Sequence, residues 1–87
     1  MENITGLVVR SKAGRDKGNR FVVLMHENEY AYVADGELRR VERPKKKKLR
    51  HLQLTGYVCE SVLNKINAGE AVENHEVRKA LAEYSEK

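Results

Sequence analysis

Residues 6–24 read GLVVRSKAGRDKGNRFVVL, and this stretch decides the fold. Two β-branched runs flank a nine-residue loop, residues 11–19, that holds two glycines and three cationic side chains. The flanking runs predict two strands. Gly14 and Gly18 predict positive φ angles and close backbone approach, because a residue with a Cβ would clash there. The stretch therefore predicts a strand, a bent loop and a second strand.

The charge of this loop predicts a phosphate-bearing ligand. Lys12, Arg15 and Lys17 supply three positive charges beside the exposed amides of the loop, and amides next to cations are suited to holding phosphate. The alternative is a structural turn that joins two strands, which needs the same glycines. Asp16 lies between two of the cations, and we expect it to form a weak surface ion pair with Arg15 or Lys17.

Short apolar or alternating runs between turn residues predict five strands in all. The expected strands cover residues 4–10, 20–25, 30–34, 37–41 and 49–54. The continuous apolar run at 21–24 is typical of a strand that is covered on both faces. A turn at residues 26–29 and a hairpin at Asp35 and Gly36 separate the middle strands. Pro44 ends the fourth strand, so residues 45–48 are expected to form a loop. Five short strands with tight turns favour a small barrel.

After residue 55 the apolar period changes from two to 3.6, which predicts two amphipathic helices. The apolar faces would be formed by Val58, Val62, Leu63 and Ile66 in the first helix, and by Val77, Ala80, Leu81 and Tyr84 in the second. We expect Gly69 to end the first helix in the left-handed conformation and Asn74 to cap the second. Residues 1–55 are thus expected to form the barrel, and residues 56–87 a helical extension packed on it.

The size and composition of the chain limit its possible functions. With 87 residues it forms one small domain with a thin core, so an enclosed active site is not expected. Charged residues make up 34% of the chain, above the usual quarter, which predicts a highly charged surface. The sequence shows neither a membrane-spanning run nor a signal-peptide pattern, so we expect a cytoplasmic protein.

The sequence offers no catalytic or metal-binding pattern. Cys59 is the only cysteine, and we expect it to be a small buried residue rather than a nucleophile. His26, His51 and His75 are scattered, without the spacing of metal ligands. The glycine loop also lacks the GKS/T ending of a nucleotide-binding P-loop. We therefore expect no enzymatic activity, no metal and no cofactor.

The positive charge is concentrated in the first part of the chain. Residues 1–53 hold thirteen Lys and Arg against seven Asp and Glu, whereas residues 54–87 hold four against six. Residues 39–51, RRVERPKKKKLRH, contain eight Lys and Arg and a single acid, Glu42. A field of this strength attracts nucleic acid. The alternative for the lysine run is a solvated loop that keeps the domain soluble.

Two aromatic side chains could contribute to binding. Tyr30 and Tyr32 lie two residues apart on one expected strand, so they share a face. They could stack on unpaired bases, as aromatics on RNA-binding sheets do. The alternative is that they fill the core of the barrel.

The loop and its flanking strands resemble a KOW motif, the short element of ribosomal proteins and transcription-elongation factors. The resemblance covers roughly residues 5–36 and is closest to KOW-containing proteins of the archaeal and eukaryotic large ribosomal subunit. It is carried by Val8, Val9, Gly14, Arg15, Asp16, Lys17, Gly18, Phe21, Val22 and Val23. The segments YVADG at 32–36 and KKKKLRHLQLT at 45–55 also resemble the hairpin and the basic strand that follow the motif. Residues 54–87 depart from that family.

This resemblance implies an SH3-like five-stranded barrel that binds structured RNA, above all ribosomal RNA, with ribosomal proteins as possible neighbours. The residues expected to contact RNA are the glycines and cations of the loop and the cations of the basic run: Lys12, Gly14, Arg15, Lys17, Gly18, Arg39, Arg40, Arg43, Lys45, Lys46, Lys47, Lys48 and Arg50. The alternative function is a protein-interaction module that docks an acidic partner through the basic face and the helices. The sequence leaves the oligomeric state open.

Overall fold

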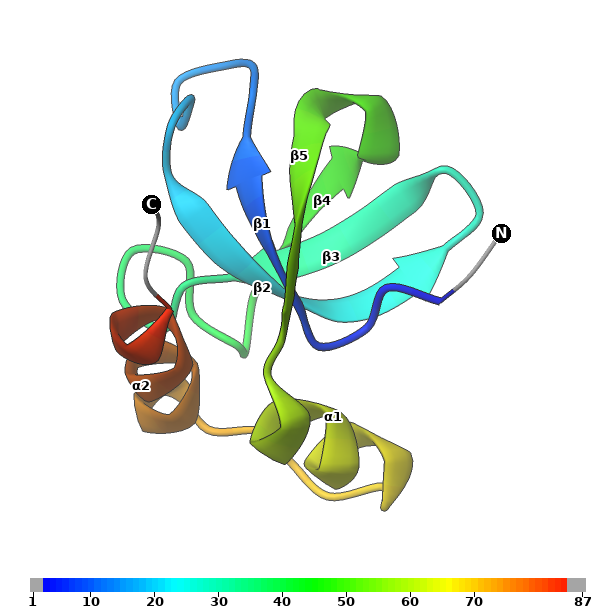
Figure 1. Cartoon of the computed structure of the whole chain (residues 1–87), viewed down its shortest axis with the longest axis vertical. Coiled ribbons are helices and arrows are strands. Elements are labelled where there is room, and N and C mark those ends of the chain that lie inside the picture. The colour runs from blue at the N-terminus through cyan, green and yellow to red at the C-terminus, as the bar shows by residue number, and fades with distance from the viewer. Residues whose placement is uncertain (1–2, 85–87) are drawn as a thin grey trace.

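The computed structural model describes residues 3–84, which form a five-stranded antiparallel sheet and two C-terminal helices (Figure 1). The strands are β1 (Leu7–Ser11), β2 (Arg20–Glu27), β3 (Tyr30–Ala34), β4 (Lys45–Lys48) and β5 (Leu52–Val58). The 3₁₀ turn η1 (Leu49–His51) joins β4 to β5, and the helices are α1 (Glu60–Asn67) and α2 (Asn74–Glu83). The prediction of a mainly β chain with C-terminal helices is confirmed.

The strand order is β4-β3-β2-β1-β5, so the two edges of the sheet belong to consecutive strands. β4 and β5 are not paired with each other, and the sheet is therefore open; a closed barrel is not confirmed. The sheet is nevertheless strongly curved. The Lys47 ammonium on β4 lies 3.0 Å from the Ser11 hydroxyl at the end of β1, although two strands separate β4 from β1.

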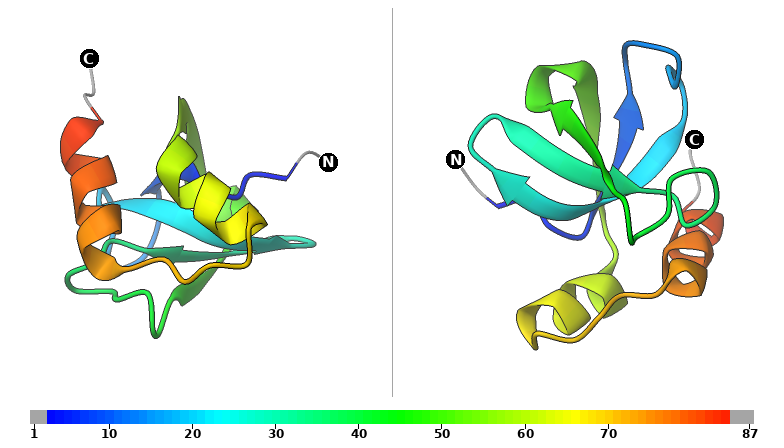
Figure 2. Two further views of the ribbon diagram at one scale, coloured as in Figure 1. Left: turned by 90° about the horizontal axis from the view of Figure 1, so that it is seen from below. Right: turned by 180° about the vertical axis from the view of Figure 1, so that it is seen from behind.

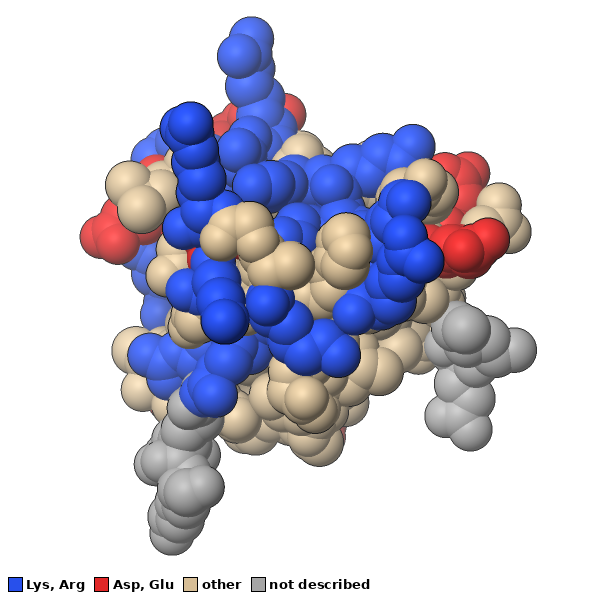
Figure 3. Space-filling view, turned by 90° about the horizontal axis from the view of Figure 1, so that it is seen from above, with Lys and Arg blue, Asp and Glu red and all other residues tan. Residues whose placement is uncertain are grey.

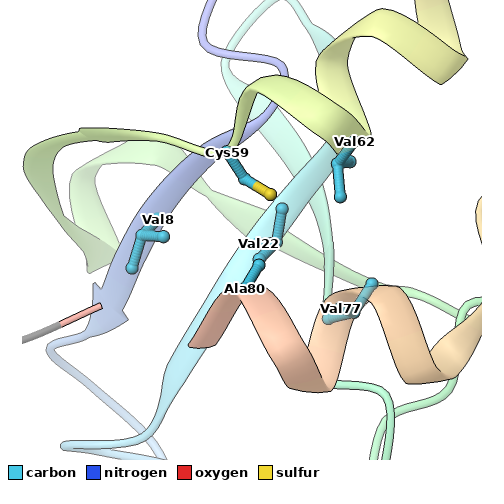
Figure 4. Close-up of a cluster of buried hydrophobic side chains, with 6 residues drawn as sticks. All are labelled: Val8, Val22, Cys59, Val62, Val77 and Ala80. Atoms are coloured by element: carbon cyan, nitrogen blue, oxygen red, sulfur yellow. The ribbon is translucent and has the colours of Figure 1, made fainter. Parts of the chain in front are cut away.

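Two hydrophobic clusters lie on opposite faces of the central strands. The cluster on the concave side consists of Val9, Phe21, Val23, Ala31, Val33 and Leu52. The cluster between the sheet and the helices consists of Val8, Val22, Cys59, Val62, Val77 and Ala80 (Figure 4). Because neighbouring residues in a strand point to opposite faces, the paired valines of β1 and β2 contribute to both clusters. The expectation that the second strand is covered on both faces is confirmed.

Two glycines allow the helices to approach the rest of the chain closely. A Cβ on Gly36, whose φ is +80°, would lie 2.5 Å from the carbonyl oxygen of Asn74 in α2. A Cβ on Gly6, whose φ is +86°, would lie 3.0 Å from the Cβ of Leu63 in α1. Figure 2 shows the two helices against the sheet and the β3–β4 connection. Each helix therefore packs against a position where the sheet part of the chain has a glycine.

The prediction of a return strand at residues 37–41 is wrong, because side chains occupy the amides that a strand would use. The Asp35 carboxylate accepts hydrogen bonds from the amides of Glu37 and Arg39 at 2.9 and 2.8 Å. The Val41 amide donates to the side chain of Asn74 at 2.8 Å. Residues 37–41 therefore form an irregular connection that is attached to α2.

The prediction of a loop at residues 45–48 is also wrong, because the four lysines form β4 and pair with β3. Alternation along the strand sends Lys45 and Lys47 to one face and Lys46 and Lys48 to the other. The first pair contacts Asp16, so part of the positive charge is neutralised inside the protein. Four consecutive lysines can form a strand here because Lys45 and Lys47 pair with an acid on one face while the other two lie on the opposite face.

The remaining boundaries differ by a few residues. The first strand begins at Leu7 instead of residue 4, and the second continues to Glu27. Residues 49–51 form η1, and β5 runs on to Val58, which was expected on the first helix. β5 therefore extends past residue 55, the expected boundary between the barrel and the helical extension.

The helix ends agree with the sequence in one case and differ in the other. Gly69 has a φ of +75°, as predicted. Glu73, not Asn74, caps α2, since its side chain and that of Glu76 form a reciprocal capping box. The Asn74 side chain instead contacts Val41 and Glu42.

Candidate nucleic-acid interface

The glycine loop, which spans residues 12–19 because β1 includes Ser11, has the predicted positive φ angles but not the predicted close approach at its glycines. Gly14 and Gly18 have φ angles of +86° and +91°, and a Cβ on Gly18 would meet no atom within 4 Å. Conformation, rather than lack of space, therefore requires glycine there. Gly18 donates its amide to the Ser11 carbonyl at 2.9 Å. The amides of residues 13–16 donate to no group within residues 3–84.

A buried ionic cluster anchors this loop to β4. The Asp16 side chain, only 12% exposed, lies 3.0 Å from the ammonium of Lys45 and 3.0 Å from that of Lys47. It also accepts a hydrogen bond from the Ser11 hydroxyl at 2.7 Å. The expected surface pair between Asp16 and Arg15 or a neighbouring lysine is therefore wrong. The carboxylate points beneath the loop, where β4 supplies better partners.

The cluster keeps Asp16 charged. Burial by itself raises the pKa of this carboxyl, because it disfavours the charged form. The hydrogen bonds from Ser11, Lys45 and Lys47 outweigh burial and hold the pKa of Asp16 well below its usual value. Asp16 thus acts as an internal anion that occupies two lysines of β4.

Only some of the expected lysines remain available to phosphate. Lys47 is 7% exposed and also donates to Ala13 O at 3.2 Å, so it belongs to the interior. Lys45 is 36% exposed and is paired with Asp16. Lys46 and Lys48 point to the opposite face of β4. The lysine run therefore does not act as one cationic loop.

The exposed cations gather where the glycine loop meets η1. The Lys12 amide donates to the His51 carbonyl at 2.8 Å, which fixes the start of the loop beside this turn. We define the basic end by four exposed residues: Lys12, Arg15, Lys17 and Arg50. Figure 3 views the molecule from this side and shows Lys and Arg side chains gathered over much of the face, with acids at its edges. Loop and turn thus lie on one side of the molecule.

The arginines between β3 and β4 have different surroundings. Arg39 lines a small hollow of about 170 Å³ together with Arg15 and Lys45, and so lies next to the basic end. Arg40 pairs with Glu42 at 3.6 Å, on the side where Glu42 meets Asn74 of α2. The exposed Arg43 donates its amide to the Arg40 carbonyl at 3.0 Å in a tight turn. The structure brings Arg39 to the glycine loop, whereas Arg40 faces the side of the helices.

Two residues that matter here were not predicted. Ser11 is 1% exposed and its hydroxyl donates to Asp16 while accepting from Lys47. Arg20 is exposed at the start of β2, and its guanidinium lies 6.0 Å from the ring centroid of Tyr84. Its position directly after the loop is the signal that could have identified it. No local signal marks Ser11, because its lysine partner lies 36 residues away.

Tyr30 and Tyr32 share the outer face of β3, as predicted, and both are half-buried. Neither belongs to a hydrophobic cluster, so they do not fill the core. The ammonium of Lys46 lies 4.3 Å from the ring centroid of Tyr30. This face lies on the opposite side of the sheet from the Asp16 cluster.

The remaining candidates from the sequence are Cys59, possible metal ligands and possible membrane-spanning segments. Cys59 is 6% exposed, which confirms that it is buried. The described residues include no group of three His, Cys, Asp or Glu side chains arranged to hold a metal. Within residues 3–84, neither helix has the length and apolar character required to cross a membrane.

The comparisons with known proteins leave the family of this chain open. Neither the comparison with protein-family models nor the comparison with curated proteins finds a match.

Proposed function

We propose that this protein binds RNA by its phosphate backbone through the basic end. The observation that carries the proposal is the position of the glycine loop beside η1, which places Lys12, Arg15, Lys17 and Arg50 around the unused amides of residues 13–16. Exposed cations release counterions from phosphates, and amides add hydrogen bonds without reading the base sequence. Affinity for many RNA sequences follows from this arrangement.

Ribosomal RNA in the cytoplasm is the target that we propose. The basis is the resemblance of residues 5–36 to the KOW motif, which here covers the glycine loop and the two strands around it. The curvature of the sheet supports the SH3-like arrangement that this resemblance implies. The edge strands β4 and β5 are joined by a three-residue turn, and Lys47 reaches Ser11 across the concave side.

An acidic protein partner is the second candidate. A groove of about 910 Å³ lies between the α1–α2 connection and residues 40–42. Its apolar lining comes from Leu24, Val41, Ile66 and Val72. The groove also carries Glu42, Glu70 and Glu73, so an acidic partner would bind mainly through the basic end and meet the groove only with apolar groups.

A filter-binding titration with an RNA hairpin separates the two functions. The triple variant K12Q/R15Q/K17Q removes three exposed charges and leaves the Asp16 cluster intact, so we expect a folded protein with RNA affinity reduced at least about hundredfold at low salt. Thermal unfolding, followed by circular dichroism, verifies folding. Undiminished binding by the triple variant contradicts the proposal. Failure of the unmodified protein to bind the hairpin at low salt favours the protein partner.

Crosslinking in cells, followed by sequencing of the attached RNA, tests the proposed target. A signal concentrated on ribosomal RNA is expected. A signal spread evenly over cellular RNA contradicts the ribosomal assignment and leaves general RNA binding in place.

A further inference from the structure

The outer face of β2, β3 and β4 carries a second group of residues that phosphate binding at the basic end does not use. Cross-strand pairing places Met25, Tyr32 and Lys46 in one row and Glu27, Tyr30 and Lys48 in the next. We call Met25, Tyr30, Tyr32, Lys46 and Lys48 the tyrosine face. Met25 is 50% exposed. Figures 1 and 2 show this arm of the sheet extending away from both helices.

The two tyrosines of this face are not required by the core. Tyr84 packs against the cluster beneath the helices, and Tyr57 packs against Tyr84 with 5.5 Å between ring centroids. Tyr30 and Tyr32 contact neither hydrophobic cluster. Tyr30 and Tyr32 are half-buried on the sheet surface and have no folding role of that kind, which favours a ligand on this face.

The lysines determine the charge of that ligand. β4 directs two lysines to the tyrosine face and two to Asp16. Lys46 already lies over the ring of Tyr30, at 4.3 Å from its centroid. Glu27 lies in the row next to the β2–β3 turn and repels a negatively charged ligand there. Such a ligand is therefore held more favourably beside Tyr32 than beside the turn.

Resting on the proposed RNA binding, we infer that the tyrosine face binds unpaired nucleotides of the same RNA. Rings two residues apart on a strand are separated by about 7 Å. Stacked bases in one strand of a duplex are only about 3.4 Å apart. Tyr30 and Tyr32 can therefore each hold a base only where the strand is unstacked. Tyr32 takes the first base, and a base on Tyr30 displaces Lys46 toward a neighbouring phosphate.

Two RNA probes test this inference: a single-stranded oligoadenylate and a blunt-ended RNA duplex without unpaired nucleotides. The variant Y32L keeps an apolar side chain and removes the ring. We expect its affinity for oligoadenylate to fall about five- to hundredfold, because stacking on an aromatic side chain contributes that much per base. Its affinity for the duplex should stay within about twofold of the unmodified protein. The control Y57L removes a tyrosine outside this face and should change neither affinity.

Fluorescence provides an independent readout, since the chain has four tyrosines and no tryptophan. Oligoadenylate should quench tyrosine emission in the unmodified protein and quench it less in Y32L. Equal affinity of Y32L and the unmodified protein for oligoadenylate overturns the inference, as does binding without quenching. Duplex binding without oligoadenylate binding overturns the inference and leaves the proposed function standing. Binding of neither probe contradicts both.

Discussion

Asp16 determines which lysines of this protein are structural. Its carboxylate, 12% exposed, is paired with Lys45 and Lys47 at 3.0 Å each. Removing the charge of a buried pair is costly, because the remaining partner stays desolvated without compensation. Lys47, which is 7% exposed, is that partner. The residue that separates two loop cations in the sequence therefore fixes the loop to β4.

We predict that D16N lowers the free energy of unfolding by about 3 kcal/mol. The asparagine keeps the shape of the side chain but leaves the Lys47 ammonium without its counter-ion. Urea denaturation measures the change. The control E37Q removes an exposed carboxylate on a neighbouring connection and should change stability by no more than about 0.5 kcal/mol. Equal stability of the two variants would show that the ionic cluster contributes nothing to folding.

The same substitution should alter the acid stability of the protein. The pKa of Asp16 is lower in the folded state than in the unfolded chain, where an aspartate titrates with a pKa of about 3.9. Its contribution is therefore complete above that value and is lost as the pH falls toward the lower, folded pKa. Below about pH 4, the unmodified protein should lose stability more steeply than D16N. Parallel pH profiles would contradict this assignment.

At this scale the sequence predicts backbone conformation better than it predicts contacts. The positive φ angles of Gly14 and Gly18 follow from residue type alone. The partners of Asp16 lie 29 and 31 residues away in β4. No local pattern connects these positions, so the sequence suggested the adjacent cations instead.

Among the elements, those with a clear apolar period were predictable and those fixed by polar contacts were not. The runs at residues 7–9 and 21–24 identified β1 and β2, and the 3.6 period identified α1 and α2. β4 was missed because four lysines carry no apolar alternation. The return strand at 37–41 was predicted wrongly because Asp35 and Asn74 bind its amides.

The contact between α2 and the β3–β4 connection leads to a prediction about stability. Gly36→Ala places a Cβ 2.5 Å from the Asn74 carbonyl oxygen, at a φ of +80°. Both strain and overlap oppose it, so we expect a loss of about 3 kcal/mol in the free energy of unfolding. Gly18→Ala, with a φ of +91° and open space, should lose only about 1 kcal/mol. Urea denaturation distinguishes them, and equal losses would show that close packing against α2 is unimportant.

For the whole molecule, charge and hydrophobic packing are divided between two regions. The basic end gathers exposed cations around the glycine loop, and the helices cover Val8 and Val22 on the other side. Residues 54–87 carry a net charge of −2 against +6 for residues 1–53. Removing the helices would expose the hydrophobic cluster that contains Val8 and Val22. The contribution of the helices to RNA binding therefore has to be tested with point substitutions in the full chain.

The salt dependence of RNA affinity tests the phosphate contacts most directly. About five contacts, from the basic end and the neighbouring Arg39, predict a log–log slope of about −4. K17Q should reduce the magnitude of that slope by about 0.8, whereas the control K79Q, which removes an exposed charge on α2, should leave it unchanged. A slope near zero, or equal reductions in the two variants, would contradict binding through the basic end.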